Sequence, residues 1–210
     1  MKDEKYLELL AEKYPTEQAV CREIINLKAI LGLPKGTEHF MSDLHGEYEA
    51  FCHILNNCSG VIREKVDLLF EETLSDIDRE EICTLIYYPE QKLELIRQRE
   101  KDLDDWYLIT LNQLVRVCRN VSSKYTRSKV RKALPKEFSY IIQELLHESS
   151  DEPNKSAYVD QIINTIISTG RANDFIIAMC NLIQRLTIDS LHIVGDIYDR
   201  GPGAHIIMDT

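Results

Sequence analysis

Two short stretches of this sequence place side chains that bind metals and phosphates directly after apolar segments. In the first, residues 191–201, an apolar run predicted to form a buried strand is followed by a glycine, two aspartates and an arginine. Carboxylates at the carboxyl end of a buried strand in an open α/β sheet lie where ligands bind. We therefore expect Asp196 to hold a cation and Arg200 to hold a phosphate through its planar guanidinium. The alternative is a polar strand-to-helix turn in which Asp199 pairs with Arg200 or caps the next helix.

The second stretch, residues 37–46, also ends a predicted strand with ligand-type side chains. Asp43 and His45 are two residues apart, so in an extended backbone they point to the same side and suit a metal pair. Together, D-x-H-G after one strand and G-D-x-x-D-R-G after another resemble the first two motifs of the calcineurin-like metallophosphoesterases. The two motifs in this order are a far more specific signal than either one alone.

The elements expected around these motifs divide the chain into three parts. Residues 1–60 are expected to hold two amino-terminal helices and a first βα unit, whose strand runs to Ser42 and whose helix runs to about Asn57. Residues 61–187 carry helical signals almost throughout, including a capping box at Ser75 and Asp78 and a helix start at Pro89. Residues 188–210 are expected to hold the second strand and the start of the following helix.

Composition narrows the class of protein. The chain has 210 residues and a formal net charge of -10, which argues against a nucleic-acid surface or an anionic membrane as partner. No apolar run approaches the roughly 18 residues of a membrane span, and the mixed charge of residues 1–5 is unlike a signal peptide. We expect a soluble, cytoplasmic protein whose six scattered cysteines are reduced and mostly in the core.

One basic segment departs from the acidic background. Arg127, Lys129, Arg131 and Lys132 follow one another closely in the sequence, and they could hold an anion such as the second phosphate of a substrate or an effector. The simpler interpretation is a solvated helix face that offsets its acidic surroundings.

The sequence separation of the two motifs points to one family within this superfamily. A calcineurin-like core usually has its first two motifs about one βα unit apart, whereas a large helical region separates Asp43 from Asp196 here. This arrangement resembles the class III fructose-1,6-bisphosphatases of bacteria. The amino-acid sequences of residues 42–49, 125–135 and 195–202 resemble that family too. The match covers the whole chain. Family members continue through an Asn-His motif and two further histidine positions, so we expect the chain to be the amino-terminal part of the enzyme.

The resemblance implies a fold and a set of roles. The fold would be α/β, part of a calcineurin-like metallophosphoesterase sandwich core with a large all-α insertion between the first two metal motifs. Asp43 and His45 would ligate a first metal, and Asp196 would bridge two metals, which the family prefers to be manganese, Mn²⁺. Asp199 would orient a histidine that lies beyond residue 210, and Arg200 would grip the phosphate. The implied reaction is hydrolysis of the 1-phosphate of fructose 1,6-bisphosphate, a step of gluconeogenesis.

Two other functions remain alternatives, and the sequence does not decide every binding partner. The chain could belong to another calcineurin-like hydrolase, acting on phosphoproteins or dinucleoside polyphosphates, or it could be a non-enzymatic helical interaction module. Small-molecule effectors and a homo-oligomer are open as partners beside the sugar bisphosphate. Because the ligand set would be incomplete, we expect residues 1–210 alone to bind metal weakly and to be inactive. The sheet would be short of strands, with four apolar residues poorly covered: Leu191, Ile193, Ile206 and Ile207.

Overall fold

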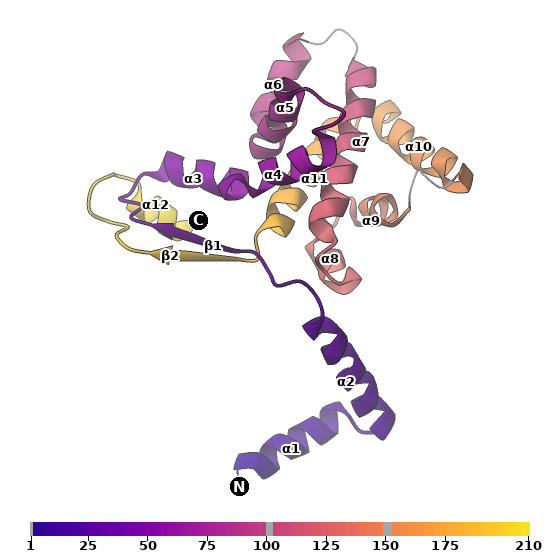
Figure 1. Ribbon diagram of the computed structural model, residues 1–210, viewed down its shortest axis with the longest axis vertical. Coiled ribbons are helices and arrows are strands. Elements are labelled where there is room, and N and C mark those ends of the chain that lie inside the picture. Colours follow the sequence, from indigo (N-terminus) through magenta and orange to yellow (C-terminus); the bar gives the residue numbers. More distant parts are fainter. Residues whose placement is uncertain (1, 100–102, 149–152) are drawn as a thin grey trace.

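The described residues form mainly helices, together with one pair of strands (Figure 1). The computed structural model describes residues 2–99, 103–148 and 153–210. The elements in chain order are α1 (Lys2–Lys13), α2 (Glu17–Leu31), β1 (Glu38–Ser42), α3 (Tyr48–Asn57), the 3₁₀ turn η1 (Cys58–Gly60), α4 (Val61–Phe70), α5 (Asp76–Tyr87), α6 (Pro89–Arg99), α7 (Leu103–Ser122), α8 (Arg127–Ala133), α9 (Ser139–His147), α10 (Pro153–Ser168), α11 (Ala172–Thr187), β2 (Ser190–Val194) and α12 (Ala204–Asp209).

Several helix ends confirm the sequence signals. The Thr16 hydroxyl accepts the backbone N–H of Ala19 at 3.1 Å, which caps α2. Ser75 and Asp78 form both halves of a capping box at the start of α5, and Pro89 is the first residue of α6. These local side-chain chemistries fix where the helices begin before any tertiary packing is considered.

The helices from α4 to α11 surround one large apolar core. Apolar faces of α7 and α11 pack against each other at its centre, and Leu114 and Ile183 are completely buried there. Every regular element among the described residues of this region is a helix, as predicted. Four of the six cysteines are buried and all six are free, as expected; burial raises the pKa of Cys83 to about 11, so this thiol is unreactive at neutral pH.

The two strands pair in parallel, although more than 140 residues separate them in the sequence. The register places Phe40 opposite His192. A second, smaller apolar cluster lies under the sheet, and it joins the strand residue Met41 to Phe51 of α3 and Ile207 of α12. This cluster holds the two motif-bearing strand ends next to the first turns of α3 and α12.

The expectation that the second strand is buried is wrong for the described chain. All five residues of β2 are exposed, because β2 pairs with β1 alone among the described residues. The predicted poor cover is confirmed for Leu191, Ile193 and Ile206, which are 38%, 36% and 40% exposed. It is wrong for Ile207, which α3 and β1 cover.

A polar junction fastens the helical region to the leading ends of both strands. The Lys124 ammonium, just after α7, donates to the hydroxyl of Thr37 before β1 at 2.9 Å and to the carbonyl of Thr187 at 2.8 Å. It also lies 3.2 Å from the carboxylate of Asp189, which precedes β2 and which Lys129 of α8 contacts at 2.5 Å. The sheet is therefore anchored to the helices at the end opposite to the motifs.

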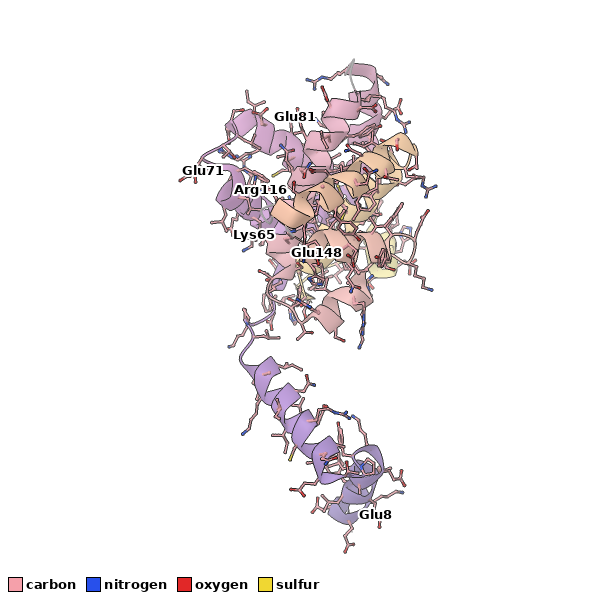
Figure 2. The ribbon with its side chains drawn as sticks, turned by 90° about the vertical axis from the view of Figure 1, so that its right-hand side faces the viewer. Glu8, Lys65, Glu71, Glu81, Arg116 and Glu148 are labelled. Carbon is pink, nitrogen blue, oxygen red and sulfur yellow. The ribbon has the colours of Figure 1, made fainter. Side chains whose placement is uncertain are left out.

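Helices α1 and α2 extend away from the rest of the molecule (Figures 1 and 2). No residue of α2 is buried. Among the described residues, no helix is both long and apolar enough to cross a membrane.

Candidate metal centre

The two motif loops meet backbone against backbone through glycines. The N–H of Gly201 donates to the carbonyl of His45, and the N–H of Gly203 donates to the carbonyl of Gly46 at 2.9 Å. A Cβ atom on Gly46 would overlap the carbonyl of Gly201, and Gly46 also has a φ of +71°. The two loops can approach this closely only because glycine occupies these positions.

A second set of contacts brings the aspartates of the two motifs together. The N–H of His45 donates to the carbonyl of Asp196 at 3.0 Å, and the N–H of Asp196 faces Oδ1 of Asp43 at 3.4 Å. Gly195, at a φ of +119°, leaves room for the Asp43 carboxylate, which a Cβ atom there would overlap. The structure therefore brings together Asp43, His45 and Asp196 from the ends of the two strands.

The backbone around Asp43 and His45 is not extended, so the reason given for their pairing is wrong. Their φ angles are 53° and 49°, in the left-handed region that few residues other than glycine adopt. Strand β1 ends at Ser42, and the chain turns sharply after it. The contacts with Gly195 and Asp196, rather than strand alternation, place these two side chains.

Three side chains form a group suited to a cation. Ligand atoms of His45, Asp196 and Asp199 all lie within 4.8 Å of one another. One imidazole nitrogen with two carboxylate oxygens is a donor set that divalent ions such as manganese accept. Asp43 lies outside this group of three, although its carboxylate contacts the backbone of Asp196.

The imidazole of His45 pairs with the carboxylate of Asp199. Its Nδ1 contacts Oδ1 of Asp199, and this hydrogen bond holds the pKa of Asp199 below its usual value. A charged carboxylate accepts hydrogen bonds only, so Nδ1 is the donor in this pair, and in the neutral imidazole Nε2 is then the nitrogen with a free lone pair. A carboxylate that fixes the tautomer in this way prepares a histidine to bind a metal.

Arg200 points largely into solvent beside this group. Its side chain is 72% exposed, and its Nε lies 3.7 Å from Oδ2 of Asp199, so the ion pair named among the alternatives is present but loose. The other alternative is wrong, because α12 follows Gly203 and no side chain caps it. The guanidinium keeps most of its donors free for a phosphate at the edge of the group.

The basic segment does not present one continuous patch. Lys129 is engaged by Asp189 and by the ring of Tyr125, which lies 4.1 Å away. Arg127 and Arg131, one helical turn apart, instead line a hollow of about 170 Å³ between α8 and α9, together with His147. Lys132 is exposed and does not line that hollow. The four basic side chains therefore lie in different environments and do not form a single anion-binding surface.

The polar residues that hold the strands in place were not predicted from the sequence. Lys124 and Asp189 are 65 residues apart, and no local pattern indicates that they meet. His39 of β1 is buried, and its Nε2 contacts the hydroxyl of Ser59 in η1; burial lowers the pKa of this imidazole. The sequence gives little sign of this buried histidine, because β1 also carries the polar residues Glu38 and Ser42.

Comparisons with known proteins agree on one family. A family model described as Firmicute fructose-1,6-bisphosphatase matches residues 5–210. A Parabacteroides distasonis protein named fructose-1,6-bisphosphatase class 3 is 75% identical over 207 residues, which make up 99% of this chain and 31% of that protein. Proteins of the same name from Bacteroides fragilis and Porphyromonas gingivalis are 73% and 63% identical, each over 99% of this chain and 31% and 32% of their own length.

The chain thus spans about a third of the length of these curated relatives. No solved structure matches it.

Proposed function

The chain belongs to the Firmicute fructose-1,6-bisphosphatase family, and we propose that it supplies part of the active site of a phosphatase that releases the 1-phosphate of fructose 1,6-bisphosphate. The relatives that carry the name fructose-1,6-bisphosphatase class 3 support this substrate. The products would be fructose 6-phosphate and phosphate, a step of gluconeogenesis. A cytoplasmic location goes with such a role in sugar metabolism.

The observation that carries the proposal is the convergence of His45, Asp196 and Asp199. The ends of two strands that are remote in sequence bring these side chains within 4.8 Å of one another, beside a largely free arginine. A helical interaction module has no need for such a group at its strand ends. A phosphatase needs both halves: anionic oxygens for cations and a guanidinium for the phosphate.

The residues of this chain would divide the work. Asp43, His45 and Asp196 would hold divalent cations, manganese by family resemblance, and Asp199 would keep His45 in the tautomer that binds. When bound, such cations supply a water of lowered pKa and offset the charge of the phosphoryl group. Arg200 would orient the phosphate through paired N–H donors. Asp199 contacts His45 of this chain, and its expected role toward a histidine beyond residue 210 stays a prediction.

We propose a calcineurin-like sandwich as the complete core, in which further strands would cover the exposed β2. For the proposed effector or second-phosphate site, the structure reduces the four candidate basic residues to two. Arg127 and Arg131 are its best candidates because they share a hollow, while Lys129 is paired with Asp189. Lys132 would contribute only long-range charge.

The test is the activity of the complete protein on a panel of phosphorylated compounds with manganese. Fructose 1,6-bisphosphate should be preferred over phosphopeptides and dinucleoside polyphosphates. Asp196→Asn should remove nearly all activity, by a factor of about 10³ or more, because a neutral amide is a poor ligand for a hard cation. The matched change Asp160→Asn on the exposed face of α10 should leave activity unchanged. Full turnover of Asp196→Asn with unchanged metal content would remove this residue from the site.

A further inference from the structure

A cavity of about 310 Å³ lies between helices α5, α6 and α7 (the α5–α7 cavity). Helices α5 and α6 stand at the end of the molecule opposite to α1 and α2 (Figure 1). The walls are mainly apolar and include the core residues Ile82, Leu85 and Leu114, and none of the described lining residues belongs to the two motif loops. A cavity of this size, with apolar walls and a few polar groups, is typical of sites for small molecules.

The charged side chains in the lining of this cavity already have partners. Lys92 of α6 is only 8% exposed, and its ammonium pairs with the carboxylate of Glu81, which Figure 2 labels. Asp78, the other carboxylate of the described lining, accepts hydrogen bonds from Ser75 in the capping box of α5. An anion would have to compete with Glu81 for Lys92, and a cation would have to compete with Lys92 and Ser75. The lining therefore suits an uncharged ligand best.

Thr110 of α7 has a buried hydroxyl without a hydrogen-bond partner in the part of the chain that the structure describes. Thr84, Thr165 and Thr187, which also lie in helices, each donate to the carbonyl four residues earlier, at 2.8, 2.7 and 2.7 Å. Thr110 is 5% exposed, makes no such bond and lines the α5–α7 cavity. Because an unpartnered buried hydroxyl costs free energy, a ligand that forms a hydrogen bond with Thr110 would recover that cost.

Two further side chains on the same face of α7 complete the polar wall. Gln113 follows Thr110 by three residues and Trp106 precedes it by four, so all three lie along one side of the helix. The Gln113 amide is half-buried and also lacks a side-chain partner among the described residues. A hydroxyl and a primary amide can each donate and accept a hydrogen bond, and the indole of Trp106 offers a flat aromatic surface.

We propose that the α5–α7 cavity binds an uncharged, flat heteroaromatic molecule whose ring contains a lactam, that is, an N–H beside a carbonyl. The rings would pack against Trp106 and the apolar walls, while the lactam would pair with the Gln113 amide and the Thr110 hydroxyl. The cavity shares no described lining residue with the metal centre, so this ligand is an effector and not the substrate.

Isoquinolone, a bicyclic lactam, is the probe for this site. It is titrated into the complete protein labelled with fluorotryptophan, and binding is followed by fluorine NMR. The resonance of Trp106, identified as the one missing from Trp106→Phe, should move in a saturable way. N-methylisoquinolone keeps the rings and the carbonyl but lacks the N–H donor, and it should bind about fivefold more weakly. Saturating fructose 1,6-bisphosphate should leave the isoquinolone titration unchanged.

Thr110→Val separates a binding role from a structural one. Valine has nearly the same shape and helix propensity, so the variant should fold, and loss of an unpartnered hydroxyl should raise the melting temperature of the free protein. The same variant should bind isoquinolone about fivefold more weakly, and Gln113→Leu should show a similar loss. Thr84→Val is the matched control, because its hydroxyl bonds within α5 and does not line the cavity. It should leave isoquinolone binding unchanged and should not raise the melting temperature.

Three results would overturn the proposal. The first is an isoquinolone titration that leaves the Trp106 resonance where it is. The second is an affinity for isoquinolone that Thr110→Val and Gln113→Leu do not alter. The third is displacement of isoquinolone by fructose 1,6-bisphosphate, which would place the probe in the active site.

Discussion

At the residue scale, the site depends on one carboxylate that prepares an imidazole. Asp199 stays charged because its hydrogen bond with His45 lowers its pKa, and it holds the proton on Nδ1. The pKa shift defines a pH window: charged Asp199 stabilises the pairing above its unfolded pKa of about 4, and this contribution is lost as pH falls through the lower folded value. Asp199 is therefore charged at neutral pH and available to pair with His45.

Arg200→Lys tests whether the exposed guanidinium handles phosphate. We expect the KM of the complete protein for fructose 1,6-bisphosphate to rise about tenfold and inhibition by free phosphate to weaken similarly, because an ammonium cannot donate two parallel hydrogen bonds. Steady-state kinetics and product inhibition measure both effects. Arg185→Lys, on the exposed side of α11, should change neither quantity. Unchanged kinetics in Arg200→Lys would exclude this residue from phosphate binding.

At the scale of elements, the site depends on how closely two loops approach each other. The loop after β1 and the loop after β2 interlock through Gly46 and Gly201, where any Cβ atom would collide with the opposite backbone. A Cβ on Gly201 would lie 2.6 Å from the carbonyl oxygen of Gly46. Glycine is therefore needed in both motifs for the close packing of the two loops, as well as for the turn that each loop makes.

Gly46→Ala and Gly170→Ala separate the two costs of replacing glycine. Both residues have φ near +70°, but nothing lies within 4 Å of a Cβ on Gly170. We expect Gly170→Ala to lower the free energy of unfolding by about 1 kcal/mol and Gly46→Ala by about 3 kcal/mol or more, since only the latter displaces backbone. Urea unfolding measures both. Equal losses would show that the loops do not interlock as described.

At the scale of the whole molecule, one polar junction ties the helical region to the sheet. Partial burial alone would raise the pKa of Asp189, but hydrogen bonds from Lys129, from the Thr37 backbone and from Lys124 outweigh it and hold the pKa well below its usual range. Asp189 therefore stays charged at any pH at which the protein functions. The two strands that carry the site are positioned from this end by α7 and α8.

Asp189→Asn should loosen this junction. We expect the free energy of unfolding at pH 7 to fall by about 2 kcal/mol, because two cations lose a partly buried partner. The folded pKa lies below the unfolded value of about 4, so the advantage of the wild type is complete above pH 4 and shrinks as the pH falls below it. Urea unfolding from pH 7 down to pH 3 measures the difference, and Asp160→Asn is the control. A gap that stays constant with pH would contradict an ionic role for Asp189.

Much of the local structure could be predicted from the sequence because its causes are local. The caps at Thr16 and Ser75 and the apolar stripes of the helical region each involve residues within a few positions of one another. The residues of the two motifs lie next to one another, as the sequence predicted, while their roles as ligands stay a prediction. The family followed from these motifs and from the helical region between them.

Tertiary structure decided what depends on contacts between remote segments. Left-handed backbone at Asp43 and His45 arises where the second motif docks, and strand alternation could not foretell it. The partner of Asp199 is His45, which lies 154 residues away, and Lys129 pairs with Asp189. Local patterns record which side chains are suited to bind a charge, but only the packed chain determines which charge lies within reach.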